Sequence, residues 1–288
     1  MVKYSGFLSR LAYVAVVPAT LFVVPAAAQD VVPEETAFSG DYLSIGIGAA
    51  LVPSYAGADD YVVTPVPIIQ GSISGVDINP RAGGLALDFI PASGNVDFDL
   101  GVAARLRGDR SIQIEDETVA GLGKLKRAIE VGPSVGIGFT QVLNPYDSFS
   151  ISADVLWDVN GAHGGMVVAP SVSYFTPINR GMAASLILSS EWGDSDFQDY
   201  YFRVTPTQSI ASGGVLPAYS PSGSGFTKAG ATLVFGVDLN GDLADGGWAL
   251  VAAGGYSRML GDAKRTPFTS EIGSADQFLA AVGIGYTF

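Results

Sequence analysis

The chain has 288 residues, of which 48% are apolar and only 15% are charged, and it contains 37 glycines and no cysteine. This composition excludes a disordered chain and a disulfide-stabilised scaffold, and the missing cysteines exclude thiolate metal sites and cysteine nucleophiles. The formal charge of -13 excludes a typical nucleic-acid partner, because such proteins neutralise phosphates with an excess of basic residues.

The first residues have the parts of a secretory signal. Lys3 and Arg10 provide a basic start, an apolar stretch follows at 11–24, and three alanines form a cleavage site. An anchoring helix is less favoured because prolines interrupt the apolar stretch. We therefore predict a signal peptide at 1–28 and a periplasmic lead-in at 29–40. An exported chain without cysteine is typical of the Gram-negative envelope.

From residue 41 onward, apolar side chains alternate with small or polar ones. In residues 42–51, for example, leucine and isoleucine alternate with serine, glycine and alanine. The same period of two recurs in six further segments, at 96–107, 129–140, 149–159, 229–239, 248–256 and 278–288. The exposed face of a soluble β-sandwich normally carries Lys, Glu and Thr. Here the face opposite the apolar one carries mainly small residues instead. A lipid-facing apolar band around a lumen of small residues explains both faces.

The lengths of the intervening segments alternate as well. Short turns are expected near 75 and at 91–95, 144–147, 177–180 and 240–246, and longer loops at 53–60, 108–126, 193–225 and 261–275. Dividing the segment 76–90 at 80–83 gives the even strand number that bacterial barrels require. We predict an all-β fold, a transmembrane antiparallel up-and-down β-barrel over 41–288 with about twelve strands, and ten strands as the alternative.

The chain ends on an alternating strand with Tyr286 and a final Phe288. This ending resembles the terminal strand signal that the outer-membrane assembly machinery reads. It predicts localisation in the cell outer membrane, with lipid and lipopolysaccharide as neighbours.

Motifs in the predicted loops follow one another in a characteristic order. They comprise Pro53, Tyr55, Gly57, Asp59, Asp60, Pro65, Pro67, Arg107, Gly108, Asp109, His163, Tyr201, Phe202, Ser212, Gly213, Tyr219, Asp262 and Pro267. Their order and spacing resemble those of the MipA/OmpV family across essentially the whole mature chain. Arg203 and Thr205 depart from that pattern, since the family usually has Gly and Ser there.

The resemblance implies an outer-membrane protein whose family is named for a scaffold joining a murein transglycosylase to a peptidoglycan synthase. Other members of the family are associated with osmotic response, surface adhesion and antibiotic susceptibility. The scaffold is therefore the first expectation for this chain. Adhesion or an osmotic-response role remains an alternative.

Several charged residues are expected to face the lumen, namely Asp97, Asp99, Arg105, Arg107, Glu130, Asp154 and Asp158. Twelve strands lie between the packed barrels of eight and the open pores of sixteen, so two interpretations remain. The charges form a plug of paired side chains, or they line a small-solute channel with weak cation preference.

A hydrolase is the least favoured alternative. Outer-membrane hydrolases need a histidine, and the chain has one, His163, with Asp158 close enough in sequence to pair with it. The chain lacks a G-x-S-x-G elbow, an H-E-x-x-H motif and a second metal-ligating histidine. The acidic turn at 238–245 resembles a calcium loop without its glycine and bidentate glutamate, and is expected to be a hairpin. We predict no enzymatic activity, cofactor or metal.

Overall fold

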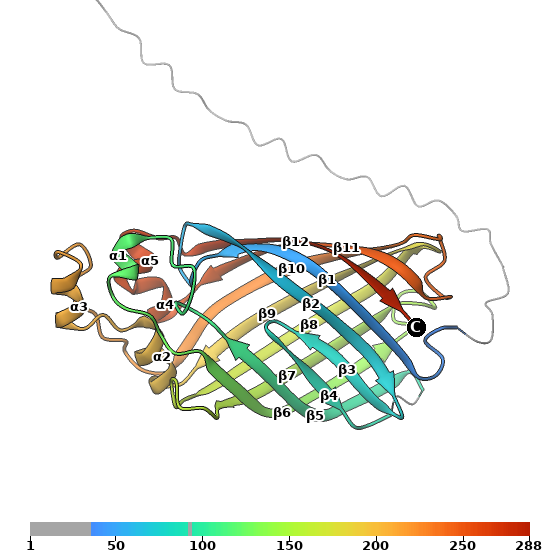
Figure 1. Ribbon diagram of the computed structural model, residues 1–288. Helices are drawn as coiled ribbons and strands as arrows, with labels where there is room; N and C mark the ends of the chain where they lie inside the picture. Colours follow the sequence, from blue (N-terminus) through green and yellow to red (C-terminus); the bar gives the residue numbers. More distant parts are fainter. Residues whose placement is uncertain (1–35, 92–93) are drawn as a thin grey trace, which may run out of the picture. The chain divides into compact units, whose positions relative to one another are not determined.

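Twelve antiparallel strands form a closed barrel in the computed structural model, which describes residues 36–91 and 94–288 (Figure 1). Each strand pairs with the next along the chain, and β1 pairs with β12 to close the barrel. The prediction of twelve strands is confirmed, and the predicted signal peptide lies outside the described residues. The strands are β1 (Tyr42–Pro53), β2 (Tyr61–Ile73), β3 (Val76–Arg81), β4 (Gly84–Asp88), β5 (Val96–Arg107), β6 (Ala128–Thr140), β7 (Ser148–Asp158), β8 (Met166–Asn179), β9 (Met182–Gly193), β10 (Gly225–Asp238), β11 (Gly247–Met259) and β12 (Asp276–Thr287).

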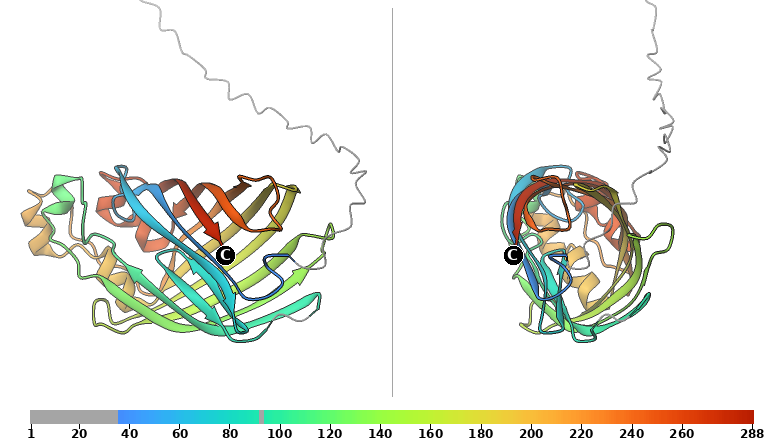
Figure 2. Two further views of the ribbon diagram at one scale, coloured as in Figure 1. Left: turned by 45° about the vertical axis from the view of Figure 1, so that its right-hand side comes forward. Right: turned by 90° about the vertical axis from the view of Figure 1, so that its right-hand side faces the viewer.

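The two ends of the barrel differ in their connections. Short turns join the strands at one end, where Phe288 also lies, and longer loops with five short helices gather at the other end (Figure 2). These helices are α1 (Glu117–Ala120), α2 (Ser195–Phe202), α3 (Pro206–Ala211), α4 (Gly261–Arg265) and α5 (Pro267–Ser270). Within residues 36–91 and 94–288, no helix has the length and apolar character needed to cross a membrane.

Residues that alternate along the sequence point alternately outward and inward from the barrel wall. Outward side chains such as Ile47 and Leu100 are 65% and 53% exposed, whereas the inward Gly101 and Ala103 are buried. Gly101 has to be small, because a Cβ there would collide with the carbonyl oxygen of Leu87 on β4. An apolar outer surface is favourable only against lipid, so the strands face the bilayer with this side.

The short hairpin of β3 and β4 interrupts the regular wall. Ser74 and Gly75 both have positive φ, 54° and 78°, which gives the tight turn from β2 into β3. Beyond this turn β3 pairs with β2 at only three positions, ending with Gly71 opposite Ile78. On its other side the hairpin remains paired with the barrel, because Gly84 to Asp88 of β4 pair with β5.

Candidate functional site

Four charged side chains form a network across the loop end of the lumen. Arg105 and Arg107 follow each other on the inward face of β5, and Glu130 of β6 lies directly opposite Arg105. Nε of Arg105 donates to Glu130 Oε2 at 2.6 Å, and Nε of Arg107 donates to Glu130 Oε1 at 2.7 Å. Glu191 of β9 completes the network, accepting from Arg107 Nη2 at 2.6 Å and from Arg105 Nη1 at 3.2 Å.

The carboxylates of this network are removed from solvent. The Glu130 side chain is fully buried and that of Glu191 is 5% exposed. Thr227 donates its hydroxyl to Glu191 Oε1 at 3.1 Å, and Lys228 Nζ lies 4.0 Å from the same oxygen. Buried charges are tolerated only when they are paired and hydrogen-bonded, so each of the four depends on the others. The network therefore spans the lumen as a polar crosslink between β5, β6 and β9.

His163 belongs to this network rather than to a catalytic dyad. Its Nε2 lies 3.2 Å from Glu130 Oε1, and its Nδ1 accepts the Gly165 N–H at 3.1 Å. Because Nδ1 is an acceptor, the proton sits on Nε2 and is donated to the carboxylate. Asp158 instead accepts the N–H groups of Asn160 and Gly164 in its own loop. Both ring nitrogens of His163 are thus engaged in structural hydrogen bonds.

A second polar cluster lies nearer the middle of the lumen. Arg81, at the end of β3, donates Nε to Asp154 Oδ2 at 2.9 Å, and Ser134 donates its hydroxyl to Asp154 Oδ1 at 2.6 Å. Asp97 and Asp99 share the inward face of β5 with Arg105. Asp154 therefore pairs with Arg81, which was not among the lumen charges expected from the sequence.

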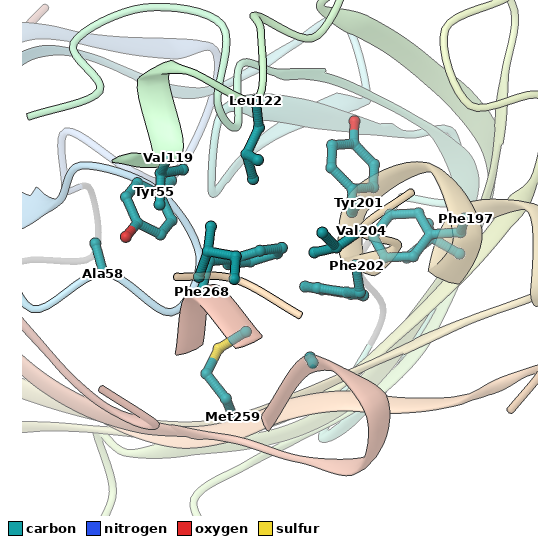
Figure 3. Close-up of a cluster of buried hydrophobic side chains, with 13 residues drawn as sticks. Tyr55, Ala58, Val119, Leu122, Phe197, Tyr201, Phe202, Val204, Met259 and Phe268 are labelled. Atoms are coloured by element: carbon teal, nitrogen blue, oxygen red, sulfur yellow. The ribbon is translucent and has the colours of Figure 1, made fainter. Parts of the chain in front are cut away.

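A hydrophobic cluster, here called the cap, fills the loop end of the barrel above the network. Its buried members come from four loops and two strand ends and point toward one another (Figure 3). They are Tyr55, Ala58, Val119, Leu122, Val167, Phe197, Tyr201, Phe202, Val204, Leu216, Met259, Ala263 and Phe268. The Cζ atom of Arg107 lies 4.8 Å from the ring centroid of Phe197 and 5.6 Å from that of Tyr201. These cation–π contacts join the cap to the network.

Hydrogen bonds fasten the loops of the cap together. Asp262 in α4 accepts from the hydroxyl of Tyr219 at 2.5 Å, from Nη2 of Arg265 at 2.8 Å and from the backbone and hydroxyl of Ser222 at 2.9 and 2.8 Å. Burial raises the pKa of Asp262, but these donors outweigh it and lower the pKa to about 2. Asp262 therefore holds the β9–β10 loop as a carboxylate.

Beneath the cap lies a cavity of about 590 Å³. Inward residues of β2, β10, β11 and β12 line one part of it, and the end of β5 with the loop that follows lines another. Its surface is mixed: Val62 and Leu279 contribute apolar area, Thr232 and Ser257 contribute hydroxyls, and Lys228 contributes a cation. Its volume lies in the range of ligand pockets, about 300–1,000 Å³.

The family model for MltA-interacting protein MipA matches residues 45–288, which is the whole of the barrel except its first three residues. The chain belongs to the MipA family. No curated protein matches it. Membership of the MipA family and the lipid-facing barrel place the protein in the cell outer membrane.

Several solved outer-membrane proteins are similar to this MipA-family barrel. An outer-membrane channel from Pseudomonas putida F1 is 11% identical, covering 90% of this chain and 100% of its own, with a TM-score of 0.46. The Pseudomonas putida toluene transporter TodX is 8% identical over 86% of this chain and 89% of its own, with a TM-score of 0.36. A porin is 9% identical over 85% of this chain and 99% of its own, with a TM-score of 0.35.

The MipA-family motif residues lie mostly in and around the cap. Tyr55, Tyr201 and Phe202 belong to its buried core, and Tyr219 binds Asp262 as described above. Pro53 is the last residue of β1 and Pro267 is the first residue of α5. The other motif residues of this end lie in the connections between elements, namely Gly57, Asp59, Asp60, Gly108, Asp109, Ser212 and Gly213. Gly57 has φ 97° and donates its N–H to Gln277, which positions the first loop over β12. Pro65 and Pro67 lie apart from the cap, within β2.

Tyr286 and Phe288 lie at the turn end. Their rings are 4.7 Å apart, and the Tyr286 ring is 5.1 Å from that of Trp248. Aromatic side chains at this level are typical of the girdle at the membrane interface.

Sequence reasoning missed several charged residues of the lumen, among them Arg81, Glu191 and Lys228. Each occupies the inward face of its strand, so strand periodicity could have identified it. Glu191, for example, alternates with the exposed Leu186 and Leu188 on the outward face of β9. Their pairing partners come from other strands and could not be read from periodicity.

Proposed function

We propose that this MipA-family barrel is an outer-membrane anchor whose periplasmic end binds a murein transglycosylase and, through it, a peptidoglycan synthase. The family takes its name from an interaction with a lytic transglycosylase, and we propose a partner of the same kind for this chain. Catalysis by the barrel itself is not part of the proposal, because His163 has no ring nitrogen left to act as a base.

The observation that carries the proposal is an apolar surface on a short turn. Leu143 and Tyr146 in the β6–β7 turn are 78% and 58% exposed, and neither lies in a strand. Short turns of bacterial barrels face the periplasm. Exposed apolar side chains on such a turn, outside the strands that face lipid, are typical of a protein-binding surface. Meanwhile the cap and the charged network obstruct the other end, which favours an anchor over an open pore.

Photo-crosslinking in living cells tests this surface. A crosslinking amino acid is placed at Leu143 on the periplasmic turn, and a matched one at Ile210 in α3, which is 80% exposed at the opposite end. We expect Leu143 to capture a murein transglycosylase or synthase, identified by mass spectrometry, and Ile210 to capture neither. Equal recovery from both positions, or none from Leu143, would contradict the anchor.

A small-solute channel is the second candidate, and the cavity under the cap is the observation that favours it. Planar-bilayer recording separates the two. Conductance steps from the intact protein would favour the channel, and their absence would favour the anchor.

A further inference from the structure

The wall of the barrel has a lateral gap between β2 and the β3–β4 hairpin. Among the described strands, β3 pairs with β2 only at its turn end, from Ile73 opposite Val76 to Gly71 opposite Ile78. Continuing this register would bring Pro80 opposite Ile69, where the ladder needs an N–H that proline lacks. The loop-side half of β2 is thereby left without a strand on this side, at the level of the outer leaflet.

The exposed edge of β2 is a poor template for an added strand. The Ser54 N–H donates to the Asp60 carbonyl oxygen, so even-numbered residues of β2 bond to β1 and odd-numbered residues point their N–H groups toward the gap. Pro65 and Pro67 occupy two of these odd positions. Their missing donors disfavour strand addition by a peptide or a second copy, and they leave fewer N–H groups unsatisfied in lipid.

The gap leads into the cavity beneath the cap. Val62 and Thr64 of β2 line that cavity on one side of the gap, and Leu106 and Ile112 line it on the other. Leu106 and Ile112 are 50% and 46% exposed, so the rim is apolar and continuous with the lipid-facing surface. Inside lies Lys228, whose side chain is 45% exposed and whose Nζ is only loosely paired with Glu191, at 4.0 Å. An apolar entrance that ends at a cation suits a molecule with an alkyl chain and an anionic head.

We propose that the gap admits a single-chain anionic amphiphile from the outer leaflet, and that the cavity binds its head group at Lys228. The site accepts such a molecule from the membrane, whereas the cap obstructs access from the external medium. This role is independent of any partner at the periplasmic turns.

Quenching of a single fluorophore tests both the route and the ligand. The chain has no cysteine, so Thr232→Cys provides a unique position in the cavity for a bimane label on the full-length protein in nanodiscs. Stearate carrying a doxyl group on its chain is added as the quencher. We expect saturable quenching, and we expect Lys228→Ala to weaken it by up to about fivefold, the upper range for a partly exposed ion pair. A doxyl lysophosphatidylcholine, which is zwitterionic, should quench less.

The route is tested with two tryptophan variants of lipid-facing leucines. Leu106→Trp narrows the gap, whereas Leu188→Trp adds the same bulk on β9, which is paired on both sides. We expect L106W to slow quenching several-fold and L188W to leave it unchanged, with heat-modifiable electrophoretic mobility confirming that both variants are folded. Equal rates in the two variants would overturn the lateral route. Equal quenching by both amphiphiles, or no effect of K228A, would overturn the anionic site.

Discussion

Glu130 is the residue on which the lumen network depends most, since it is fully buried and binds Arg105, Arg107 and His163. Replacing it with alanine leaves two largely buried arginines with only one carboxylate, that of Glu191, between them. We expect Glu130→Ala to lower the free energy of unfolding by about 3–5 kcal/mol, the usual cost of breaking a buried ion pair. Urea unfolding of the barrel in lipid vesicles measures this change.

The matched control for Glu130→Ala is an exposed ion pair in the same molecule. Arg180 and Asp242 pair at 3.2 Å with side chains 67% and 35% exposed. Asp242→Asn should cost less than about 1 kcal/mol, because surface pairs are screened by water. An equal loss of unfolding free energy in the two variants would show that burial does not determine the strength of the network.

Asp262 makes the cap sensitive to acid. Its folded pKa of about 2 lies below its ordinary value of 3.8, so its contribution to stability is complete above about pH 4 and disappears as the pH falls toward 2. A spin label at Ile210→Cys on α3 should therefore gain mobility over this range. With Asp262→Asn added, the label should already be mobile at neutral pH and should show little further change. An unchanged acid transition in that variant would assign it to another group.

At the scale of single elements, neighbouring positions on one strand have opposite environments. Leu233 near the middle of β10 faces lipid and is 40% exposed, whereas Thr232 lines the cavity. Leu233→Arg should cost about 2–4 kcal/mol if the residue lies near the bilayer midplane. Thr232→Arg should cost about 1 kcal/mol or less, as expected for a polar site with room. If unfolding in vesicles showed a similar loss of stability for both variants, the assignment of Leu233 as outward and Thr232 as inward would be contradicted.

The strands themselves were largely predictable, because alternation is a local property of the chain. Even the short hairpin followed from Pro80 and Gly83, which mark the end of one strand and the turn to the next. The consequence of that hairpin was not predictable, since the gap beside β2 depends on how far β3 and β2 remain in register.

At the scale of the whole molecule, the cap and the network together obstruct the lumen. In the end-on view of Figure 2, segments of the loops are seen across the barrel opening. We expect no conductance steps from the intact protein in planar bilayers. Replacing residues 195–223 with a short linker should produce steps with cation preference, because inward acids such as Asp97 and Asp99 remain.

A smaller deletion controls for general damage to the loops. Removing residues 206–214 takes away α3, none of whose residues is buried, and leaves α2 and its aromatic side chains in place. This variant should remain closed. Steps from it, or from the intact protein, would contradict occlusion by the cap.

The sequence by itself determined a membrane barrel of about twelve strands, with ten left as the alternative, the lipid-facing side of its alternating segments and a resemblance to the family, because these follow from period-two patterning and from motifs along the chain. Only the tertiary structure decided that Glu191 joins Arg105 and Arg107, that His163 binds Glu130, and that β2 has a free edge. The physical reason is that contacts across a lumen depend on the accumulated register of several strands. Each register is fixed by backbone pairing around the whole barrel rather than by residues near in sequence.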